Sequence, residues 1–376
     1  MPSDAGAIPI AIFLPAAGPT RAERWLAGAR AAAGEDLLQN LRTAGYGPCS
    51  IVAAEQADRD RFQALGALPL SEGPQPFHFG RTLARLVEER GFTHLAYFGG
   101  ASAPLASAEL LMSWRAQVSG LPPGGALVNN LHSTDWAILR DARRLVPLAD
   151  RLPTDNSMGW VLKAESGAVV EEPPPTTASR TDFDTPSDLA LILGHPALGS
   201  QLRQALHPFP EELRRKVERL AAVLRTPAAS VALLGRVSEN AWLELNRRTQ
   251  VWARVYAEER GMRASGRQER GEVRSLIADM LEASGPAGFI QRLESMVKAV
   301  VWDTRVWMAQ RTDKWPKAGD RMAADLGWVD DVEDEALRQL TKAIEAAQIP
   351  IVTGGHGVVS GSLLAFLESL FQEASR

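Results

Sequence analysis

The sequence predicts an α/β protein of two domains with mainly parallel sheets. Short apolar runs alternate with longer segments of helical periodicity, which is typical of parallel strands joined by helices. The alternation restarts near position 230, after a charged and leucine-rich stretch, so the 376 residues divide into two domains. A content of 45% hydrophobic and 23% charged residues excludes a chain that is disordered, collagen-like or coiled-coil as a whole.

Charge and cysteine content limit the classes of function. Basic residues number 41 against 45 acidic ones, and this net charge of -4 gives no field that would attract nucleic acid. The single cysteine, Cys49, cannot form an internal disulfide. The apolar run 8–17 is interrupted by Pro9 and Pro15, unlike a signal peptide, and no run approaches the roughly 18 apolar residues of a membrane helix. We therefore expect a cytoplasmic protein without nucleic-acid or membrane partners, whose oligomeric state the sequence leaves open.

In the first half, residues 8–14 form an apolar run that ends at the turn from Pro15 to Thr20, as a buried strand would. Ser107 is a suitable N-cap, with Glu109 in the first turn of the helix that it begins. In chain order, the predicted elements are strand 8–14, helix 24–44, strand 49–54, helix 59–66, helix 81–90, strand 93–98, helix 107–118 and strand 126–130.

The boundary between the domains follows a short helix. Pro186 fits the first turn of a helix that Thr185 caps and that extends to 193. The charged, leucine-rich residues 208–224 predict a connecting helix. The predicted organisation is therefore a domain over 1–200, a helical connector over 201–229 and a second domain over 230–376.

The second half repeats the alternation and predicts a Rossmann-like, three-layer α/β domain. Six of the ten tryptophans lie in this half, which indicates a core of its own. The predicted elements are strand 230–234, helix 239–250, strand 253–257, helices 270–283 and 287–297, an apolar segment 299–308, helix 333–347, strand 350–352 and a final helix that reaches about 374.

The segment from Asp182 to Leu189 carries the clearest candidate for chemistry. Alternate residues of an extended segment point to the same side, so Asp182 and Asp184 can present two carboxylates together. Two oxygen donors beside an open site suit Mg²⁺ held between protein and substrate phosphates. A turn followed by an N-cap explains the same residues without a metal.

Four stretches of the first 200 residues resemble the nucleotidyltransferases that make guanylated cofactors, namely the molybdenum-cofactor guanylyltransferases and, more closely, the 2-phospholactate guanylyltransferases. The matching stretches, in order, are 10–21, 97–111, 129–139 and 181–189, of which the last has the pattern Asp-x-Asp-Thr-Pro-x-Asp-Leu. The resemblance implies a GT-A-like α/β fold, a nucleotide loop in the first stretch, a metal site in the second, acceptor contacts in the third and a closing motif in the fourth. It also implies transfer of a nucleotidyl group to a phosphorylated or phosphonylated acceptor, with release of pyrophosphate.

The departures from this family concern its phosphate and metal sites. Its first loop is glycine-rich with a lysine and an arginine, whereas this chain has only Gly18, followed by Arg21 and Arg24. Where the family places a metal-binding aspartate, this chain has Ser102. Losing one carboxylate weakens Mg²⁺ binding and the stabilisation of the leaving pyrophosphate.

A polar loop follows the strand at 126–130. Open α/β sheets bind ligands beyond the carboxyl ends of their strands, so these residues are candidate ligand contacts. A solvated loop in which Ser133 or Thr134 caps a helix from Trp136 explains them equally well. Asp155 and its neighbours form either a further polar wall or an Asx turn. The candidate binding residues of the loop are Asn130, Ser133, Thr134 and Asp135.

In the second half, a glycine-rich loop with His356 at its centre stands between a strand and a helix. Exposed backbone amides there could seat an anion, although a tight turn with positive φ is an alternative. His356 is the candidate base. Three further strand ends could converge on the same edge, although Asp303 and Arg305 could instead form a structural ion pair. The candidate binding residues here are Arg236, Ser238, Glu259, Asp303, Arg305, Gly355, Gly357 and Ser360.

Three functional hypotheses result. The first is a divergent nucleotidyltransferase-like protein that binds a nucleotide or phosphorylated small molecule, with Asp182 and Asp184 on Mg²⁺ and Arg21 or Arg24 on phosphate. The second is a binding or regulatory protein that has kept the fold and lost catalysis. The third places catalysis in the second domain, with the first as a platform.

Overall fold

The computed structural model describes residues 6–73, 76–263, 265–311 and 315–372. The chain forms two compact units that are interleaved in sequence. Unit 1 consists of Met1–Ala17, Ala27–Arg180 and Gly199–Ala205, and unit 2 of Gly18–Leu26, Thr181–Leu198 and Leu206–Arg376. This division differs from the predicted boundaries because two early segments contribute apolar side chains to the core of unit 2, among them Ala22 and Leu191.

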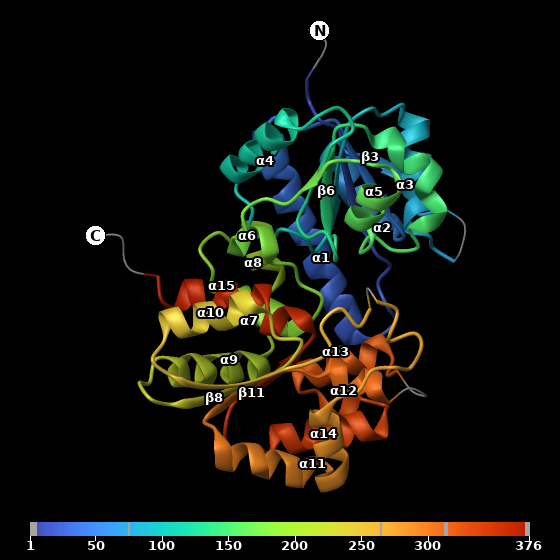
Figure 1. Ribbon diagram of the computed structural model, residues 1–376. Helices are drawn as coiled ribbons and strands as arrows, with labels where there is room; N and C mark the ends of the chain where they lie inside the picture. The colour runs from blue at the N-terminus through green and yellow to red at the C-terminus, as the bar shows by residue number, and fades with distance from the viewer. Residues whose placement is uncertain (1–5, 74–75, 264, 312–314, 373–376) are drawn as a thin grey trace. The chain divides into compact units, whose positions relative to one another are not determined.

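Unit 1 is built on a seven-stranded sheet of order β3-β2-β1-β4-β6-β5-β7 (Figure 1). β6 runs antiparallel to its neighbours β4 and β5, and the other pairs are parallel. The central strands are almost continuously apolar, as a sheet covered on both faces requires. The strands are β1 (Ile10–Leu14), β2 (Cys49–Ala53), β3 (Leu68–Leu70), β4 (Leu95–Gly99), β5 (Ala126–Val128), β6 (Trp136–Leu139) and β7 (Val170–Glu171).

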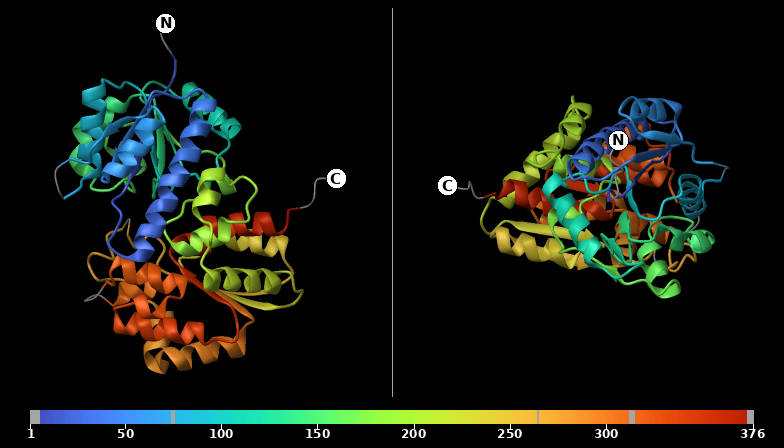
Figure 2. Two further views of the ribbon diagram at one scale, coloured as in Figure 1. Left: turned by 180° about the vertical axis from the view of Figure 1, so that it is seen from behind. Right: turned by 90° about the horizontal axis from the view of Figure 1, so that it is seen from above.

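Helices cover both faces of this sheet, as Figure 2 shows from two further directions. On one face, Leu38, Phe62 and Trp114 from α1, α2 and α4 pack in a single core. On the other face, α3, η1 and α5 supply the core. The helices are α1 (Arg21–Thr43), which begins in unit 2, α2 (Gln56–Ala64), α3 (Phe79–Arg90), α4 (Ala108–Gly120), η1 (Ala142–Arg151), α5 (Met158–Glu165), α6 (Thr177–Arg180) and α8 (Ser200–Ala205).

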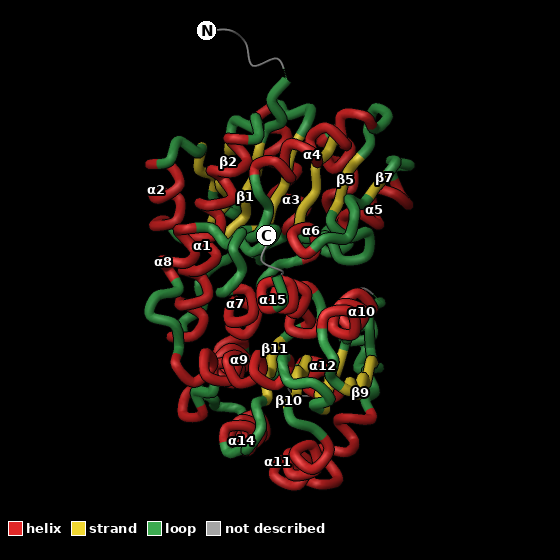
Figure 3. Tube along the Cα trace, turned by 90° about the vertical axis from the view of Figure 1, so that its left-hand side faces the viewer, coloured by secondary structure: helices red, strands yellow, loops and turns green. Residues whose placement is uncertain are grey.

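Unit 2 contains a four-stranded, wholly parallel sheet of order β11-β10-β8-β9. Its strands are β8 (Ser230–Gly235), β9 (Trp252–Ala257), β10 (Ala299–Asp303) and β11 (Ile351–Gly354). In Figure 3 the strands of each unit are yellow and the covering helices red.

Two helical layers cover the sheet of unit 2. One core contains residues of α7, α9, α10 and α15, and the other contains residues of α11, α13 and α14. The helices are α7 (Pro186–Ile192), α9 (Glu211–Leu224), α10 (Glu239–Arg248), α11 (Leu276–Met296), α12 (Arg305–Gln310), α13 (Ala318–Leu326), η2 (Val329–Asp331), α14 (Glu335–Glu345), η3 (His356–Val359) and α15 (Gly361–Leu370).

The predicted α/β class with mainly parallel sheets is confirmed. β6 refutes the alternative of a helix from Trp136, and the short strands β3, β6 and β7 were not predicted. The two helices predicted at 270–283 and 287–297 correspond to the two parts of α11, which begins at Leu276 and whose backbone breaks at Gly285 with φ 67°. The predicted end of the final helix near 374 lies outside the described residues. No helix in the described ranges has the length and apolar character that membrane crossing requires.

Candidate functional site

The carboxyl edge of the first sheet carries the polar residues predicted for unit 1. β4 ends at Gly99, and the turn after it holds the buried Ser102, whose hydroxyl donates to the Gly99 carbonyl oxygen at 2.7 Å. β6 begins beside the same turn, because the Gly99 N–H donates to the carbonyl oxygen of Asp135 at 3.1 Å. The structure thus brings Ser102 and Asp135 to one turn.

Asn129 fixes the orientation of Asp135. Its side-chain nitrogen donates to Asp135 Oδ2 at 2.6 Å, and its side-chain oxygen accepts from the Asp135 N–H at 2.8 Å. The rest of the loop is ordered by bonds of Asn130 with the His132 N–H, of Ser133 with Asn156, and of Thr134 with the Asn130 carbonyl and the Gly159 N–H. The loop is therefore a folded turn that presents one half-buried carboxylate.

A second carboxylate belongs to the same edge. The hydroxyl of Tyr97, on β4, donates to Asp155 Oδ2 at 2.6 Å. Burial raises the pKa of Tyr97 well above its ordinary value, and the charges of Asp155 and Asp135 raise it further. Tyr97 therefore stays protonated at neutral pH and donates to Asp155. Sequence reasoning missed Tyr97, because an aromatic residue within an apolar strand indicates only core.

The predicted nucleotide loop folds as the start of α1, within unit 2. The Thr20 hydroxyl accepts from the Glu23 N–H at 3.2 Å, and the Glu23 carboxylate accepts from the Thr20 N–H at 3.1 Å, which is a capping box. A Cβ at Gly18 would overlap the Glu23 carboxylate. Arg24 donates to the Pro19 carbonyl oxygen. Gly18 and Arg24 thus have structural roles at this helix start.

Arg21 lies in acidic surroundings within unit 2. Its guanidinium carbon is 3.6 Å from the ring centroid of Trp328, and its Nη2 is 3.7 Å from Asp331 Oδ2. It lines a hollow of about 460 Å³ whose other charged residues are all acidic, namely Glu212, Asp330, Asp331 and Glu345. These carboxylates compete with any phosphate for Arg21, so its contact with a substrate phosphate stays a prediction.

The motif from Asp182 to Leu189 forms the start of α7 and also belongs to unit 2. Thr185 Oγ1 accepts from the Asp188 N–H at 3.4 Å, and Asp188 Oδ2 accepts from the Thr185 N–H at 2.9 Å, so the predicted N-cap at Thr185 is confirmed. Asp188 is fully buried. Burial raises its pKa to about 7, against hydrogen bonds from Thr185 and Ser362 and with a further rise from Asp184.

The predicted metal pair, Asp182 and Asp184, lies next to this cap. The charge of Asp184 acts on Arg263, Arg321 and His356. Guanidinium groups repel a divalent cation, and a Mg²⁺ ion held by Asp182 and Asp184 stays a prediction. Within the described ranges, no group of three or more His, Cys, Asp or Glu side chains is placed to hold a metal ion.

The glycine loop packs against the same cap. The glycines at 354, 355 and 357 do not have the positive φ of the predicted tight turn, and that expectation was wrong. Close approach requires them instead: a Cβ at Gly357 would overlap Asp188 Oδ1, and one at Gly355 would lie 3.1 Å from Thr185 Cγ2. Ser360 Oγ accepts from the Gly361 N–H at 2.6 Å where α15 begins. The loop therefore packs closely against the first residues of α7.

His356 lies between these glycines and keeps an exposed face. The protein packed around its inner face lowers the pKa of His356, and Arg236 adds to this effect against the opposing charge of Asp303. The imidazole is therefore neutral at pH 7, with a nitrogen lone pair that can accept a hydrogen bond.

Two arginine–aspartate pairs lie at the ends of β8 and β10. Arg236 Nε and Nη2 donate to the two oxygens of the fully buried Asp303 at 2.5 and 3.1 Å. Burial opposes ionisation of Asp303, but Arg236 still holds its pKa below the ordinary range. Arg305 donates to both oxygens of Asp325 at 2.9 and 2.5 Å. Burial raises the pKa of Asp325, yet this bidentate geometry favours the ionised pair.

The predicted convergence of strand ends is therefore present in part. Asp303 and Arg305 are not each other's side-chain partner, although the Arg305 N–H donates to Asp303 Oδ1 at 3.2 Å. Ser238 caps α10, accepting from the Ala241 N–H at 3.2 Å, and its own N–H donates to the Val359 carbonyl oxygen. Glu259 is instead paired with Arg267 at 2.8 Å.

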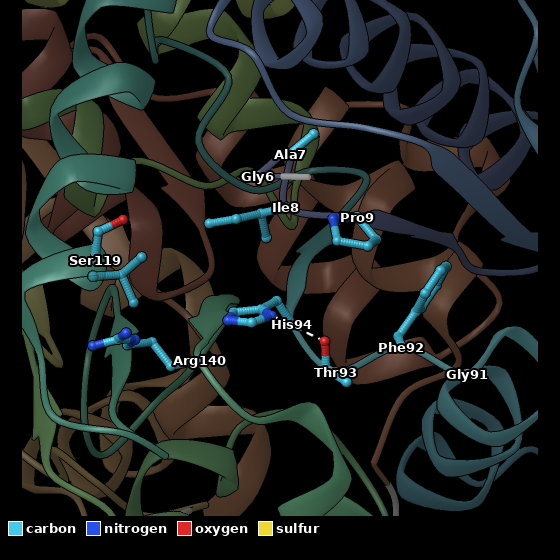
Figure 4. Close-up of a pocket in the computed structure, with 11 residues that line it drawn as sticks. Gly6, Ala7, Ile8, Pro9, Gly91, Phe92, Thr93, His94, Ser119 and Arg140 are labelled. Carbon is cyan, nitrogen blue, oxygen red and sulfur yellow. Dashed lines mark hydrogen bonds between the residues drawn. The ribbon is translucent and has the colours of Figure 1, made fainter. Parts of the chain in front are cut away.

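A cavity of about 360 Å³ opens at the opposite edge of the first sheet (Figure 4). It lies at the amino ends of β1 and β4, where Thr93 and His94 contact one another and Arg140 lies across from them. The polar residues described above are at the carboxyl ends, where α/β sheets bind ligands. We therefore give this cavity no part in the candidate site.

No protein-family model matches the chain, and no curated protein matches its sequence. Among solved structures, a protein from Aquifex aeolicus VF5 is similar with 14% identity and a TM-score of 0.37, covering 48% of this chain and 94% of its own. CMP:2-keto-3-deoxy-manno-octonic acid synthetase complexed with CTP is similar with 13% identity and a TM-score of 0.34, covering 48% of this chain and 95% of its own. TM-scores this low do not establish a shared fold, so neither protein's activity transfers to this chain.

Proposed function

We propose that unit 1 is nucleotidyltransferase-like: it binds a nucleoside triphosphate and a phosphorylated acceptor at the carboxyl edge of its sheet. The main support is the pair of carboxylates of Asp135 and Asp155 beside the Ser102 turn. The resemblance implies one metal-binding aspartate at Ser102, and two acids from neighbouring segments are present there instead.

Mg²⁺ fits this edge better than it fits Asp182 and Asp184. Both Asp135 and Asp155 are half-buried. Asp155 accepts from the Tyr97 hydroxyl, and a Cβ at Gly99 would lie within 4.0 Å of that hydroxyl, of Ser102 Oγ and of the Asp135 carbonyl oxygen, so the segments that carry both acids meet at this turn. Mg²⁺ prefers a few carboxylates together with substrate phosphates and water. Bound there, it would neutralise the charge of the leaving pyrophosphate.

The protein's own contribution would be positioning. A phosphate oxygen of the acceptor attacks the α-phosphorus of the nucleotide, a new P–O bond forms, the bond to the β-phosphate breaks, and pyrophosphate leaves. Asn129 holds Asp135 in one orientation, and Tyr97 does so for Asp155. Fixed groups of this kind accelerate a reaction because they need no reorganisation in the transition state.

Thermal unfolding with each nucleoside triphosphate, with and without Mg²⁺, tests this proposal. A ligand at about 100 times its dissociation constant stabilises the native state by about 2.7 kcal/mol, which is readily measured. We expect a Mg²⁺-dependent shift with one triphosphate, lost in Asp135→Asn and Asp155→Asn. Asp150→Asn is the matched control, because Asp150 is an exposed acid of unit 1 that is paired with Arg81.

Each alternative hypothesis has its own outcome. A shift that Asp184→Asn abolishes and Asp135→Asn leaves intact would move the metal to the originally predicted pair. A shift in thermal unfolding without release of pyrophosphate, whichever acceptor is added, would indicate a binding protein that has lost catalysis. The absence of a shift with every triphosphate would refute the proposal and direct the search to unit 2.

A further inference from the structure

The two edge strands of the second sheet differ in how they are covered. The strand order places β11 and β9 at the two ends of this sheet (Figure 3), and all four residues of β11 are buried. β9 is six residues long, with four residues exposed and the other two half-buried. The edge strands of the first sheet are shorter, because β3 has three residues including Pro69, and β7 has two. Shortness and proline are common protections of a sheet edge, and β9 has neither.

Alternate backbone groups of β9 point away from the sheet. The Trp252 N–H donates to the carbonyl oxygen of Ala229, just before β8, at 2.8 Å. The Glu258 N–H, just after β9, donates to the carbonyl oxygen of Gly235 at 2.9 Å. Because successive N–H groups of a strand point to opposite sides, those of the odd-numbered residues point away from β8. Val255 lies in the middle of this outer row, which faces no further strand in the described part of the chain.

The side chains of β9 extend an apolar face beyond the helices that cover the sheet. Val255 packs against the core that contains residues of α9, α10 and α15. Tyr256 points to the other face, because it is in register with Leu234 of β8, whose core contains residues of α11. Trp252 and Arg254 share that face, since alternate side chains of a strand point the same way. Trp252 is 69% exposed and Tyr256 is 41% exposed, so α11 leaves this part of the sheet uncovered.

The start of α11 lies at the carboxyl end of β9. The hydroxyl of Ser275, the N-cap of α11, donates to Glu258 Oε1 at 2.5 Å. Leu276 follows Ser275 in the chain and is 77% exposed. In the described ranges, Leu276 and Trp252 are the two most exposed large apolar side chains. One lies at each end of β9.

We propose that β9 pairs with β9 of a second copy of this chain, antiparallel about a two-fold axis at Val255. The pairing joins the two four-stranded sheets into one continuous sheet. A two-fold axis brings the Trp252 end of each strand to the Glu258 end of the other, so Trp252 of one copy lies near Leu276 of the second. The two most exposed apolar side chains thereby lose contact with water. All of these residues belong to unit 2, so the pairing does not depend on the nucleotide site proposed for unit 1.

Charge and backbone geometry select this register. With Val255 on the axis, Arg254 of each copy lies directly opposite Tyr256 of the other, where a guanidinium group can stack on an aromatic ring. Moving the axis to Arg254 would place two cations opposite each other, which is unfavourable. Moving it to Tyr256 would place Ala253 opposite Glu259, whose φ of 55° is not that of an extended strand.

Analytical ultracentrifugation over a range of protein concentrations tests the pairing. We expect the wild type to be in equilibrium between monomer and dimer. Val255→Pro is expected to be monomeric, because proline removes an outward N–H and interrupts no bond to β8. Trp252→Ser is expected to weaken the dimer roughly tenfold or more. Trp160→Ser is its matched control, because Trp160 is 51% exposed but lies in unit 1.

Two charge variants test the register. Arg254→Glu removes the cation opposite Tyr256 and is expected to weaken the dimer. Tyr256→Glu places a carboxylate opposite Arg254 and is expected to give a dimer at least as tight as that of the wild type. The double variant Arg254→Glu/Tyr256→Arg exchanges the two partners and is expected to restore the dimer that Arg254→Glu weakens. Both side chains are exposed, and far-UV circular dichroism checks that each variant keeps its fold.

Three results would overturn the inference. A wild type that is monomeric at every concentration would leave this edge for a segment of a different protein. A dimer that is unchanged in Val255→Pro would be formed elsewhere on the chain. A dimer that Tyr256→Glu weakens as much as Arg254→Glu does would contradict the register with Val255 on the axis.

Discussion

Replacing Asp188 by asparagine removes the buried acid that caps α7. We expect this substitution to change how the free energy of unfolding depends on pH. The side chain is fully buried, and its pKa rises from 3.8 to about 7. Because one pKa unit corresponds to 1.36 kcal/mol, ionising this carboxyl in the folded state costs roughly 4 kcal/mol. The amide oxygen of asparagine can still accept the hydrogen bond from the Thr185 N–H. Its amide nitrogen can donate a hydrogen bond to the hydroxyl oxygen of Ser362.

The direction of the pH dependence follows from the raised pKa of Asp188 in the folded state. The folded state holds the proton more tightly than the unfolded chain, so this group's contribution is complete below pH 3.8 and is lost as the pH rises to about 7. Relative to Asp188→Asn, the wild type is expected to lose roughly 3 kcal/mol of unfolding free energy between about pH 4 and pH 7. Arg305 and Asp184 also act on this carboxyl and remain in both proteins.

Urea unfolding of both proteins, followed by tryptophan fluorescence at several pH values, measures this difference. Ser362→Ala is a second variant, because it removes a bond that favours the ionised form and should steepen the pH dependence. Parallel stability curves for wild type and Asp188→Asn across this window would refute the reasoning, since the buried carboxyl would then cost nothing to ionise.

Three further predictions concern the same network and the helix caps. Asp303→Asn leaves Arg236 buried without its counter-charge and should destabilise unit 2 by about 3–5 kcal/mol in urea unfolding. Gly357→Ala forces a Cβ onto Asp188 Oδ1 and should cost about 1–3 kcal/mol by thermal unfolding. Gly28→Ala is its control, because a Cβ there meets no atom within 4 Å. Ser107→Ala removes the cap that accepts from the Leu110 N–H at 3.2 Å and should cost about 1 kcal/mol.

The elements that the sequence predicted well are those set by local chemistry. The caps at Ser107 and Thr185 depend on side chains within three residues of their partners, and both are present. Long apolar runs marked the central strands of both sheets for the same reason. The short strand β6 was missed because its pairing depends on β4, some forty residues earlier.

The candidate sites were harder to predict, because they join residues that are distant in sequence. Nothing near Asp155 signals that it bonds to Tyr97. The assignment of 181–198 to the first domain failed for a related reason: chain order suggests the preceding domain, whereas Leu191 packs in the core of unit 2.

The Asp-x-Asp-Thr-Pro-x-Asp-Leu motif matches a family pattern in sequence, but most of its residues have a structural role in this chain. In this chain its last aspartate caps α7, and it receives a hydroxyl from Ser362 on α15 while Gly357 leaves room for it. These contacts account for Thr185, Pro186 and Asp188 without a metal. They do not involve the Asp184 side chain, whose charge acts on Arg263 and Arg321. A substitution at Asp184 therefore tests the originally predicted metal pair: loss of a Mg²⁺-dependent nucleotide shift in Asp184→Asn would favour the metal there.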